Sequence, residues 1–375
     1  MSARFQTRRA FLCHAASGLI LTGSSLARAQ SPTQSPAIVW HDVRDIGVEG
    51  KGWTDTAKYY DRLPARAEGR VPEGVWMQSR HSAGMFVSFR TDATEICTDH
   101  VVSSSNLSVP DLAAIGMSGL DLYATDGNGD WKWLSVTRPR TQAMKGVLIN
   151  GLAPGERQYK LYLPLYNGTE SLKIGIPAGS SFTHIAPRTA KPIVFYGTSI
   201  TQGASASRPG MPHVAILGRR LDVPVINLGF GGAGKMEPEV GELLTELDPA
   251  VYVIDCLPNM NAREVSERAL PLVEQLRRRR AGVPVVLVED RTYANAQFLP
   301  ARQRAQAENR QSLQKAFQSL QQSGMKNLFY IEGDSLLGQD REDTSDSSHP
   351  TDLGFWRQAE RLEPVLRAGL AAAGS

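Results

Sequence analysis

The chain has 375 residues, 41% of them hydrophobic and 21% charged, which is the composition of a globular protein long enough for two domains. Its formal net charge is +3, but four arginines and no acidic residue lie in the first 29 positions, so the remainder carries a net charge of −1. This balance gives no basis for nucleic-acid binding or for attraction to an anionic membrane. After residue 29 no run of about 20 apolar residues is present, so we expect no membrane insertion.

The N-terminus is predicted to be an export signal over residues 1–29. Residues 7–12 (TRRAFL) contain a twin-arginine pair, a modestly apolar run extends to Leu26, and residues 27–29 (ARA) form a small-x-small cleavage motif. The twin-arginine route carries folded proteins. We therefore expect a periplasmic or secreted protein.

Residues 36–186 are predicted to form an antiparallel β-sandwich. Short runs with period-two alternation, such as residues 84–90, are separated by turn sequences such as residues 126–130 (DGNGD). No helical periodicity is evident across residues 70–180. The Pro-bounded stretch 187–192 is a plausible linker to a second domain.

Residues 191–372 alternate apolar strands with helical patterns, which predicts a parallel sheet covered by helices on both faces. The expected strands are residues 193–196, 225–228, 251–255, 283–289 and 327–331. The expected helices are residues 212–221, 238–247, 264–280, 303–323 and 355–371.

Polar residues follow several of these strands. Ser199 comes directly after the first strand, where open α/β sheets expose reactive groups. A hydroxyl nucleophile needs a base and a carboxylate to orient that base, and Asp346 and His349 can supply both from one loop. A glycine turn at residues 229–232 and an asparagine, Asn259, offer N–H donors for the oxyanion of an ester's tetrahedral intermediate.

These four blocks resemble the SGNH (GDSL-like) hydrolases, which are named for Ser, Gly, Asn and His in that order. The resemblance implies that Ser199 is the nucleophile, His349 the base and Asp346 its partner. It also implies that Gly232 and Asn259 form the oxyanion hole with the backbone N–H of Ser199. Two blocks depart from the usual pattern, because Gly-Asp-Ser is replaced by Gly-Thr-Ser and Gly-x-Asn-Asp by Leu-Pro-Asn-Met. The α/β-hydrolase elbow, Gly-x-Ser-x-Gly, fits poorly, since threonine stands two residues after the serine.

The first domain carries a second resemblance. Residues 119–123 (GLDLY) are similar to the Gly-x-Asp-Leu-Tyr motif of a β-domain fused to one branch of SGNH hydrolases, and residues 208–211 (RPGM) are typical of that branch. Fusions of a jelly-roll to an SGNH domain occur in secreted bacterial carbohydrate esterases, mostly polysaccharide deacetylases. The resemblance implies an α/β, flavodoxin-like catalytic domain preceded by a jelly-roll-like accessory domain. The apolar stretch 163–166 (LPLY) predicts that this accessory domain packs near Ser199.

Two cysteines lie beyond the predicted signal. Cys97 and Cys256 stand in apolar strand-like stretches, which favours buried free thiols over the disulfide that an oxidising compartment would permit. No Cys/His spacing indicates a metal site, and no cofactor is implied.

The expected activity is that of a serine esterase that removes small acyl groups, acetyl foremost, from a carbohydrate by a Ser-His-Asp acyl-enzyme mechanism. A lipase or thioesterase is the enzymatic alternative, although no long apolar run near the serine or after the asparagine block offers a site for an acyl chain. A non-catalytic carbohydrate-binding protein is the alternative from another class. The glycan, the hydroxyl position and the oligomeric state stay open.

Overall fold

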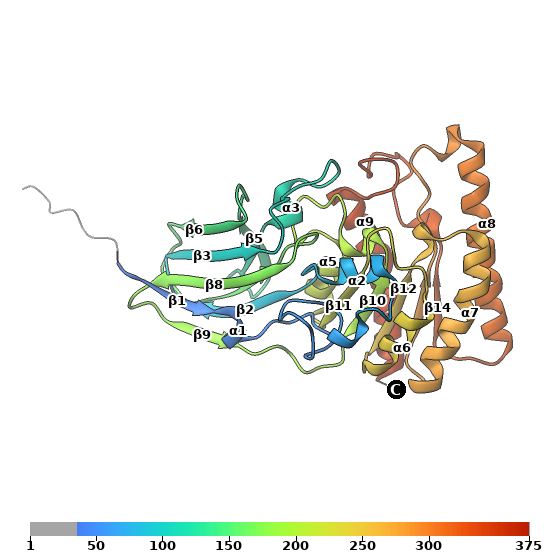
Figure 1. Cartoon of the computed structure of the whole chain (residues 1–375), viewed down its shortest axis with the longest axis horizontal. Coiled ribbons are helices and arrows are strands. Elements are labelled where there is room, and N and C mark those ends of the chain that lie inside the picture. Colours follow the sequence, from blue (N-terminus) through green and yellow to red (C-terminus); the bar gives the residue numbers. More distant parts are fainter. Residues whose placement is uncertain (1–35, 375) are drawn as a thin grey trace, which may run out of the picture. The chain divides into compact units, whose positions relative to one another are not determined.

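The computed structural model of the chain describes residues 36–374 (Figure 1). From Ala37 onward these residues form one compact unit that contains three β-sheets. The predicted export signal, residues 1–29, lies outside the described residues, so it stays a prediction. Within the described part of the chain, no helix combines the length and the apolar character that crossing a membrane requires.

The N-terminal half is a sandwich of two antiparallel sheets, as the sequence predicts. One sheet has the strand order β1-β8-β3-β6 and the other β5-β4-β7-β2-β9. The strands are β1 (Ile38–Asp42), β2 (Phe86–Thr91), β3 (Glu95–Val102), β4 (Asp121–Thr125), β5 (Trp131–Val136), β6 (Ala143–Asn150), β7 (Arg157–Tyr162), β8 (Thr169–Pro177) and β9 (Phe182–Ile185). Side chains of both sheets, such as Phe89, Leu161 and Ile174, share one buried apolar cluster. Alternating residues of each strand supply this core, which is why the period-two pattern is readable in the sequence.

Three short helices accompany the sandwich, namely α1 (Val43–Ile46), α2 (Glu73–Ser79) and α3 (Ala114–Ser118). Two of them, α2 and α3, lie where the sequence shows no helical periodicity. With seven and five residues, each is about two turns or less, which is too short for a 3.6-residue repeat to appear.

The C-terminal half contains a parallel sheet of five strands in the order β11-β10-β12-β13-β14 (Figure 1). This is the flavodoxin-like order, in which the strand order reverses beside the first strand. Its strands are β10 (Ile193–Gly197), β11 (Val225–Gly229), β12 (Val251–Asp255), β13 (Val285–Val288) and β14 (Leu328–Ile331). The three central strands, β10, β12 and β13, are buried along their whole length, which explains their continuous apolar sequences.

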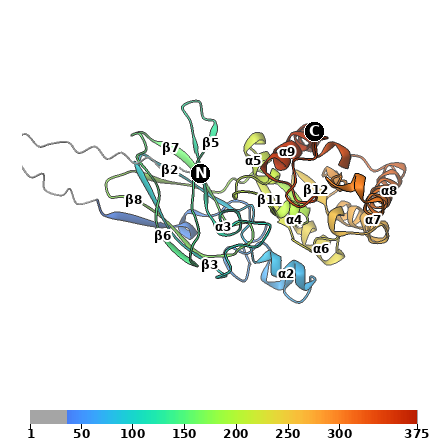
Figure 2. The same cartoon turned by 90° about the horizontal axis from the view of Figure 1, so that it is seen from above.

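Helices cover both faces of this sheet, as predicted (Figure 2). They are α4 (Ser199–Gln202), α5 (His213–Leu221), α6 (Pro238–Glu246), α7 (Ala262–Arg279), α8 (Pro300–Gln322) and α9 (Asp352–Ala373). Apolar residues of α6, α7 and α8 join one core cluster, and those of α5 and α9 join another. The arrangement places the carboxyl ends of β10, β11 and β12 at one edge, where the candidate residues lie.

The segment before β2 packs into the core of the parallel-sheet half. Leu63, Val75 and Trp76 belong to the same apolar cluster as Leu228 of β11 and Leu244 of α6. The two halves of the chain therefore share a hydrophobic core. Cys97 and Cys256 are both free and buried, so the expectation of two buried thiols is confirmed.

Candidate active site

Ser199 stands at the carboxyl end of the central strand β10. The buried residues of β10 end at Gly197, and Thr198 then caps the one-turn helix α4, its hydroxyl accepting a hydrogen bond from the backbone N–H of Ile200 at 3.3 Å. Ser199 is the first residue of this helix and is half-buried. Its hydroxyl is therefore held at the crevice where open α/β sheets place their reactive groups.

A histidine and an aspartate stand in line with this serine. His349 Nε2 lies 2.9 Å from Ser199 Oγ, and His349 Nδ1 lies 2.6 Å from Asp346 Oδ2. An ionised carboxylate only accepts hydrogen bonds, so Nδ1 carries the proton and Nε2 is left to accept from the serine hydroxyl. The three side chains form a continuous relay of hydrogen bonds.

The loop that carries Asp346 and His349 is closed by its own backbone. Thr344 and Pro350 form an antiparallel bridge, and the N–H of Ser345 donates to the carbonyl of His349 at 2.9 Å. Burial works against the charge of Asp346, but hydrogen bonds from the His349 backbone and ring and from the Ser348 N–H outweigh it and lower the pKa of Asp346. The carboxylate is thus ionised at neutral pH.

The predicted oxyanion donors lie around the same point. Gly232 has a φ of 69°, the left-handed conformation that favours glycine. The N–H of the preceding Gly231 donates to Gln202 Oε1 at 2.9 Å. Within residues 36–374 no hydrogen bond is found for the N–H of Gly232. Asn259 ends a 3₁₀ turn, Leu257–Asn259, and its Nδ2 donates one hydrogen bond to the carbonyl of Ala233, which leaves one N–H of the amide.

One cavity, here called the Ser199 cavity, joins four of the five candidates and has a volume of about 370 Å³. Ser199, Gly232, Asn259 and His349 line it, and Asp346 lies behind the histidine. Residues from the N-terminal half complete its wall, namely Gln78, Val109, Asp111, Leu112 and Tyr166. The hydroxyl of Tyr166 donates to the backbone carbonyl of Ser199 at 3.1 Å. The expectation that the apolar stretch 163–166 packs near the serine is confirmed.

Comparisons with known proteins agree with this geometry. Residues 190–367 match the GDSL-like Lipase/Acylhydrolase family, and residues 38–182 match the N-terminus of SGNH-hydrolase-type esterases, named for Gly-x-Asp-Leu-Tyr. A solved structure from Bacteroides ovatus ATCC 8483, described as a GDSL-like lipase, is 32% identical over 89% of this chain and 98% of its own, with a TM-score of 0.85. The chain belongs to the GDSL-like (SGNH) hydrolase family. It is accordingly an esterase of the SGNH type.

Two further solved structures share the fold of this SGNH hydrolase at lower identity. The salicylyl-acyltransferase SsfX3 from a tetracycline biosynthetic pathway is 19% identical, with 90% of this chain and 96% of that one covered and a TM-score of 0.68. A family two carbohydrate esterase from Clostridium thermocellum, solved with cellohexaose, is 15% identical, with 77% and 95% covered and a TM-score of 0.52. A comparison with curated proteins finds no match.

Gln202 holds the glycine turn at residues 229–232 of this SGNH hydrolase, and it was not predicted from the sequence. It is fully buried, and besides accepting from the N–H of Gly231 it donates through Nε2 to Gln78 Oε1 and to the carbonyl of Leu165, each at 3.1 Å. It thereby links the glycine turn to two segments of the N-terminal half. The sequence offers no signal for this role, because its partners are far apart along the chain.

Arg62 is the second supporting residue that sequence reasoning missed. Its side chain is 1% exposed and donates to the carbonyls of Asn227 at 3.1 Å and Gly229 at 2.7 Å, at the end of β11. It also donates to the carbonyls of Gln78 and His81. Burial lowers the pKa of Arg62 to about 9, so the guanidinium keeps its charge at neutral pH. Arg62 therefore joins the start of the glycine turn at residues 229–232 to helix α2.

A buried ion pair lies at the end of β12, close in sequence to the asparagine turn. Asp255, the last residue of β12, accepts from Arg291 Nη2 at 2.6 Å, and both side chains are 1% exposed. Asp255 also accepts from the hydroxyl of Thr201 in α4 at 3.1 Å. These bonds join helix α4 and Arg291 to the end of β12.

The two branch-specific motifs meet in the structure. Asp121 of the Gly-x-Asp-Leu-Tyr motif is fully buried and accepts from Arg208 Nη1 at 2.9 Å and from the N–H of Gly210 at 2.8 Å. Arg208 also donates to the hydroxyl of Tyr123 at 2.5 Å. A Cβ at Gly210 would lie 2.5 Å from the Tyr123 ring, so only glycine fits. The motifs therefore lock the sandwich to the loop that follows the serine helix.

Proposed function

We propose that this SGNH hydrolase is a serine esterase that removes small acyl groups, acetyl foremost, from a carbohydrate. The observation that carries the proposal is the relay in which Ser199 Oγ lies 2.9 Å from His349 Nε2 and His349 Nδ1 lies 2.6 Å from Asp346. Such a relay serves to activate a hydroxyl as a nucleophile. A half-buried strand end does not need such a relay for its stability.

In the proposed acylation step, Ser199 Oγ attacks the ester carbonyl carbon while its proton passes to His349 Nε2. Asp346 holds the resulting imidazolium in place and stabilises its charge. The carbonyl oxygen becomes an oxyanion that takes hydrogen bonds from the N–H groups of Ser199 and Gly232 and from Nδ2 of Asn259. The intermediate then collapses, the bond to the alkoxy oxygen breaks, and the alcohol leaves with the proton from His349.

In the deacylation step a water molecule takes the place of the alcohol. His349 accepts its proton as the water oxygen attacks the acyl carbon of the ester on Ser199. Collapse of the second intermediate returns the proton to Ser199 Oγ and releases the carboxylic acid. The chain's own residues supply every proton transfer in this cycle.

The size of the Ser199 cavity supports a small acyl group. A volume of about 370 Å³ is near the lower end of the range of about 300–1,000 Å³ for small-molecule sites, and both the acyl group and part of the alcohol must fit. Besides apolar residues such as Val109 and Leu112, the wall of the Ser199 cavity contains Gln78, Asp111 and Ser348, whose polar groups suit an alcohol rich in hydroxyls. The shared fold with a family two carbohydrate esterase is consistent with a saccharide as that alcohol.

The alternatives are a lipase or thioesterase and a non-catalytic carbohydrate-binding protein. The relative from Bacteroides ovatus is described as a GDSL-like lipase, so the length of the acyl chain is an open experimental question. The formed relay at Ser199 favours catalysis over binding alone. We also propose that the chain acts in the periplasm or outside the cell after export by the twin-arginine route, on the basis of residues 1–29.

The test is acetate release from a panel of acetylated polysaccharides and oligosaccharides by the wild type, Ser199→Ala and Ser207→Ala. Ser199→Ala should lose at least about 10³-fold in kcat and stay folded, and adding His349→Ala should cost little more, because the relay acts as a unit. Ser207, which donates to Asp352 outside the Ser199 cavity, is the matched control and should leave kcat unchanged. Substantial turnover by purified Ser199→Ala, or no acetate release from any saccharide by the wild type, would contradict the proposal.

A further inference from the structure

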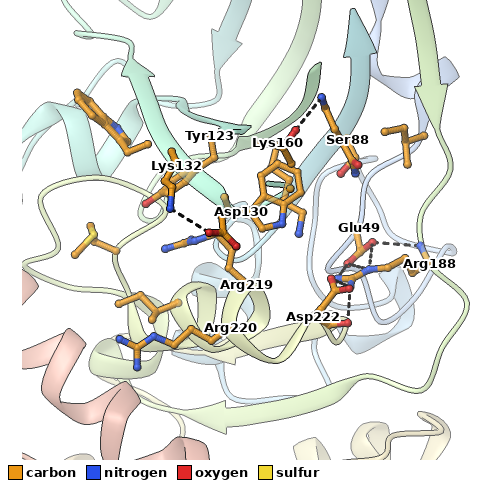
Figure 3. Close-up of a pocket in the computed structure, with 18 of the residues that line it drawn as sticks. Glu49, Ser88, Tyr123, Asp130, Lys132, Lys160, Arg188, Arg219, Arg220 and Asp222 are labelled. Carbon is orange, nitrogen blue, oxygen red and sulfur yellow. Dashed lines mark hydrogen bonds and ion pairs between the residues drawn. The ribbon is translucent and has the colours of Figure 1, made fainter. Parts of the chain in front are cut away.

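A second and larger cavity lies between the N-terminal sandwich and helix α5, with a volume of about 840 Å³ (Figure 3). We call it the charged cavity, because six cationic side chains line it, namely Lys132, Lys160, Arg188, Arg208, Arg219 and Arg220. Only three acidic residues line it, Glu49, Asp130 and Asp222. In the described chain it shares no lining residue with the Ser199 cavity, so the proposed reaction does not account for it.

Four of the six cations are already paired with carboxylates. Figure 3 shows Arg188 bonded to Glu49, at 2.5 Å, and to Asp222, at 2.9 Å. The other three pairs are Arg208 with Asp121, Arg220 with Glu363, and Lys132 with Asp126 and Asp130. Their charges are neutralised within the protein.

Lys160 and Arg219 are the two cations that remain. Lys160 is 4% exposed, and its backbone pairs with Ser88 of β2, the dashed line in Figure 3. Its ammonium lies 4.3 Å from the centre of the Trp131 ring and forms no ion pair or hydrogen bond with any residue between 36 and 374. Arg219 stacks on Tyr123, its guanidinium carbon 4.1 Å from the ring centre, and its buried Nη1 has no hydrogen-bond partner in that same part of the chain. Neither forms an ion pair within 4 Å in the described residues, although Asp121 attracts Arg219 from further away and the Tyr162 hydroxyl interacts with its side chain. Buried charges are costly unless they are paired, so an anion would satisfy both.

Aromatic side chains form part of the wall of the charged cavity. Trp133 is 50% exposed and Trp356 is 45% exposed, and both line the cavity. Arg208 lies over the Trp133 ring at 5.2 Å and Arg220 over the Trp356 ring at 4.1 Å, so one face of each ring is covered by an arginine. The exposed part of each ring offers a flat apolar face to a ring-shaped ligand. The cavity thus combines a site for negative charge with a site for the apolar face of a sugar.

We propose that the charged cavity binds an acidic saccharide, in which a carboxylate on a sugar ring pairs with Lys160 and Arg219 while the ring packs against Trp133. The evidence for an anion-binding site comes from the charged cavity alone. The choice of a sugar as the molecule that bears the carboxylate rests on the proposed carbohydrate esterase function. The site would hold an acidic glycan on the enzyme apart from Ser199, and so direct the esterase toward polysaccharides that carry carboxylates.

The charge of Lys160 makes this binding dependent on pH. Burial lowers the pKa of Lys160 to about 8, with Arg188 and Arg219 lowering it and Glu49 and Asp222 raising it. The ammonium is charged at pH 7 and loses its proton as the pH rises through 8. Affinity for a carboxylate should therefore be several-fold weaker at pH 9.5 than at pH 7.

The experiment is a calorimetric titration of the full chain carrying Ser199→Ala, which prevents turnover, with three probes. These are trigalacturonic acid without acetyl groups, a neutral trisaccharide (xylotriose) and inorganic phosphate. Lys160→Met and Arg219→Gln each remove one unpaired cation and keep most of the side-chain volume. Lys145→Met is the matched control, because Lys145 also lies over a tryptophan ring, Trp40 at 4.6 Å, but outside the cavity and paired with Asp99.

Trigalacturonic acid should bind, and its affinity should fall by about 10–100-fold in each cavity variant, the usual effect of losing a charge-assisted bond, and stay unchanged in Lys145→Met. Equal binding of xylotriose, binding of phosphate but not of the acidic sugar, insensitivity to both cavity variants, or no binding at all would overturn the proposal. If Lys160→Met does not fold, Arg219→Gln alone decides. In a chain that keeps Ser199, the single variant Lys160→Met should hydrolyse p-nitrophenyl acetate at the wild-type rate. Loss of saccharide binding in the charged cavity is thereby distinguishable from failure of the esterase assignment.

Discussion

Replacing Asn259 by alanine removes an amide that has two separate tasks in the structure. One N–H of the side chain is bonded to the carbonyl of Ala233, and the other is free to reach an oxyanion in the cavity shared with Ser199. Loss of one oxyanion donor lowers kcat by about 10²–10³-fold, or about 2.7–4 kcal/mol. Loss of the bond to Ala233 should lower the free energy of unfolding by about 1 kcal/mol. At about 2.1 cal/mol/K per residue for the entropy of unfolding, this shifts the Tm of the described chain by about 1–2 °C.

Asn261 is the matched control two residues further along the chain. It lies outside the Ser199 cavity and caps helix α7, where its side chain accepts from the N–H of Glu264 at 3.0 Å and Glu264 accepts from its N–H at 2.9 Å. Asn261→Ala should therefore lower Tm by a similar 1–2 °C, since such a cap contributes about 1 kcal/mol, while kcat stays unchanged.

The assay is steady-state hydrolysis of p-nitrophenyl acetate, combined with thermal denaturation followed by circular dichroism. Two variants with the same loss of Tm should differ by two orders of magnitude or more in kcat. If Asn259→Ala keeps kcat within about threefold of the wild type, or if Asn261→Ala loses as much, then Asn259 is not the oxyanion donor.

Four other predictions concern the same site. Asp346→Asn should lower kcat by about 10²–10⁴-fold in the same assay, because the amide no longer holds the proton on His349 Nδ1; a variant within tenfold of wild type would contradict this. Because the pKa of Asp346 is lowered from 3.8 in the folded protein, its contribution to stability is present above pH 3.8 and disappears as the pH falls further, so urea unfolding should separate wild type from Asp346→Asn at pH 6 but not near pH 2. Arg62→Met should lower the free energy of unfolding, measured in urea, by about 3–5 kcal/mol, because four backbone carbonyls lose a buried donor at about 1 kcal/mol or more each, and a loss under 1 kcal/mol would refute the role assigned to it. The kcat/KM for p-nitrophenyl esters should fall from acetate through butyrate to octanoate, with about 1–3 kcal/mol for each misfit methylene, and a preference for octanoate would indicate a lipase.

Much of the fold was predictable because burial leaves a pattern in the sequence. The central strands of the parallel sheet are buried on both faces and read as continuous apolar runs, and the sandwich strands alternate because one face of each is buried. The candidate residues Ser199 and His349 were found because each follows a recognisable local feature, a strand end in one case and a short Asp-His loop in the other. The helices α2 and α3 were missed because one or two turns do not show a period.

The supporting residues of the site were not predictable from the sequence. Gln202 and Arg62 act by bonding to backbone groups of distant segments, and any residue has a carbonyl and most have an N–H. A long polar side chain inside an apolar stretch of sequence shows only that its polar atoms need hydrogen-bond partners. Which carbonyls meet it depends on how the loops pass one another in space.

The boundary near residues 187–192 is visible in composition, yet the contacts of the site cross it in several places. Apolar side chains such as Leu63 and Trp76 complete the core beneath β11, and composition alone does not tell which of two cores an apolar residue joins. Arg62, from the same segment, donates to the carbonyls of Asn227 and Gly229 at the start of the glycine turn. Tyr166, from the loop between β7 and β8 of the sandwich, donates a hydrogen bond to the backbone carbonyl of Ser199. Since a donor must be placed to within a few tenths of an ångström to stabilise an oxyanion, the segments that fix these loops belong to the esterase site as much as the parallel sheet does.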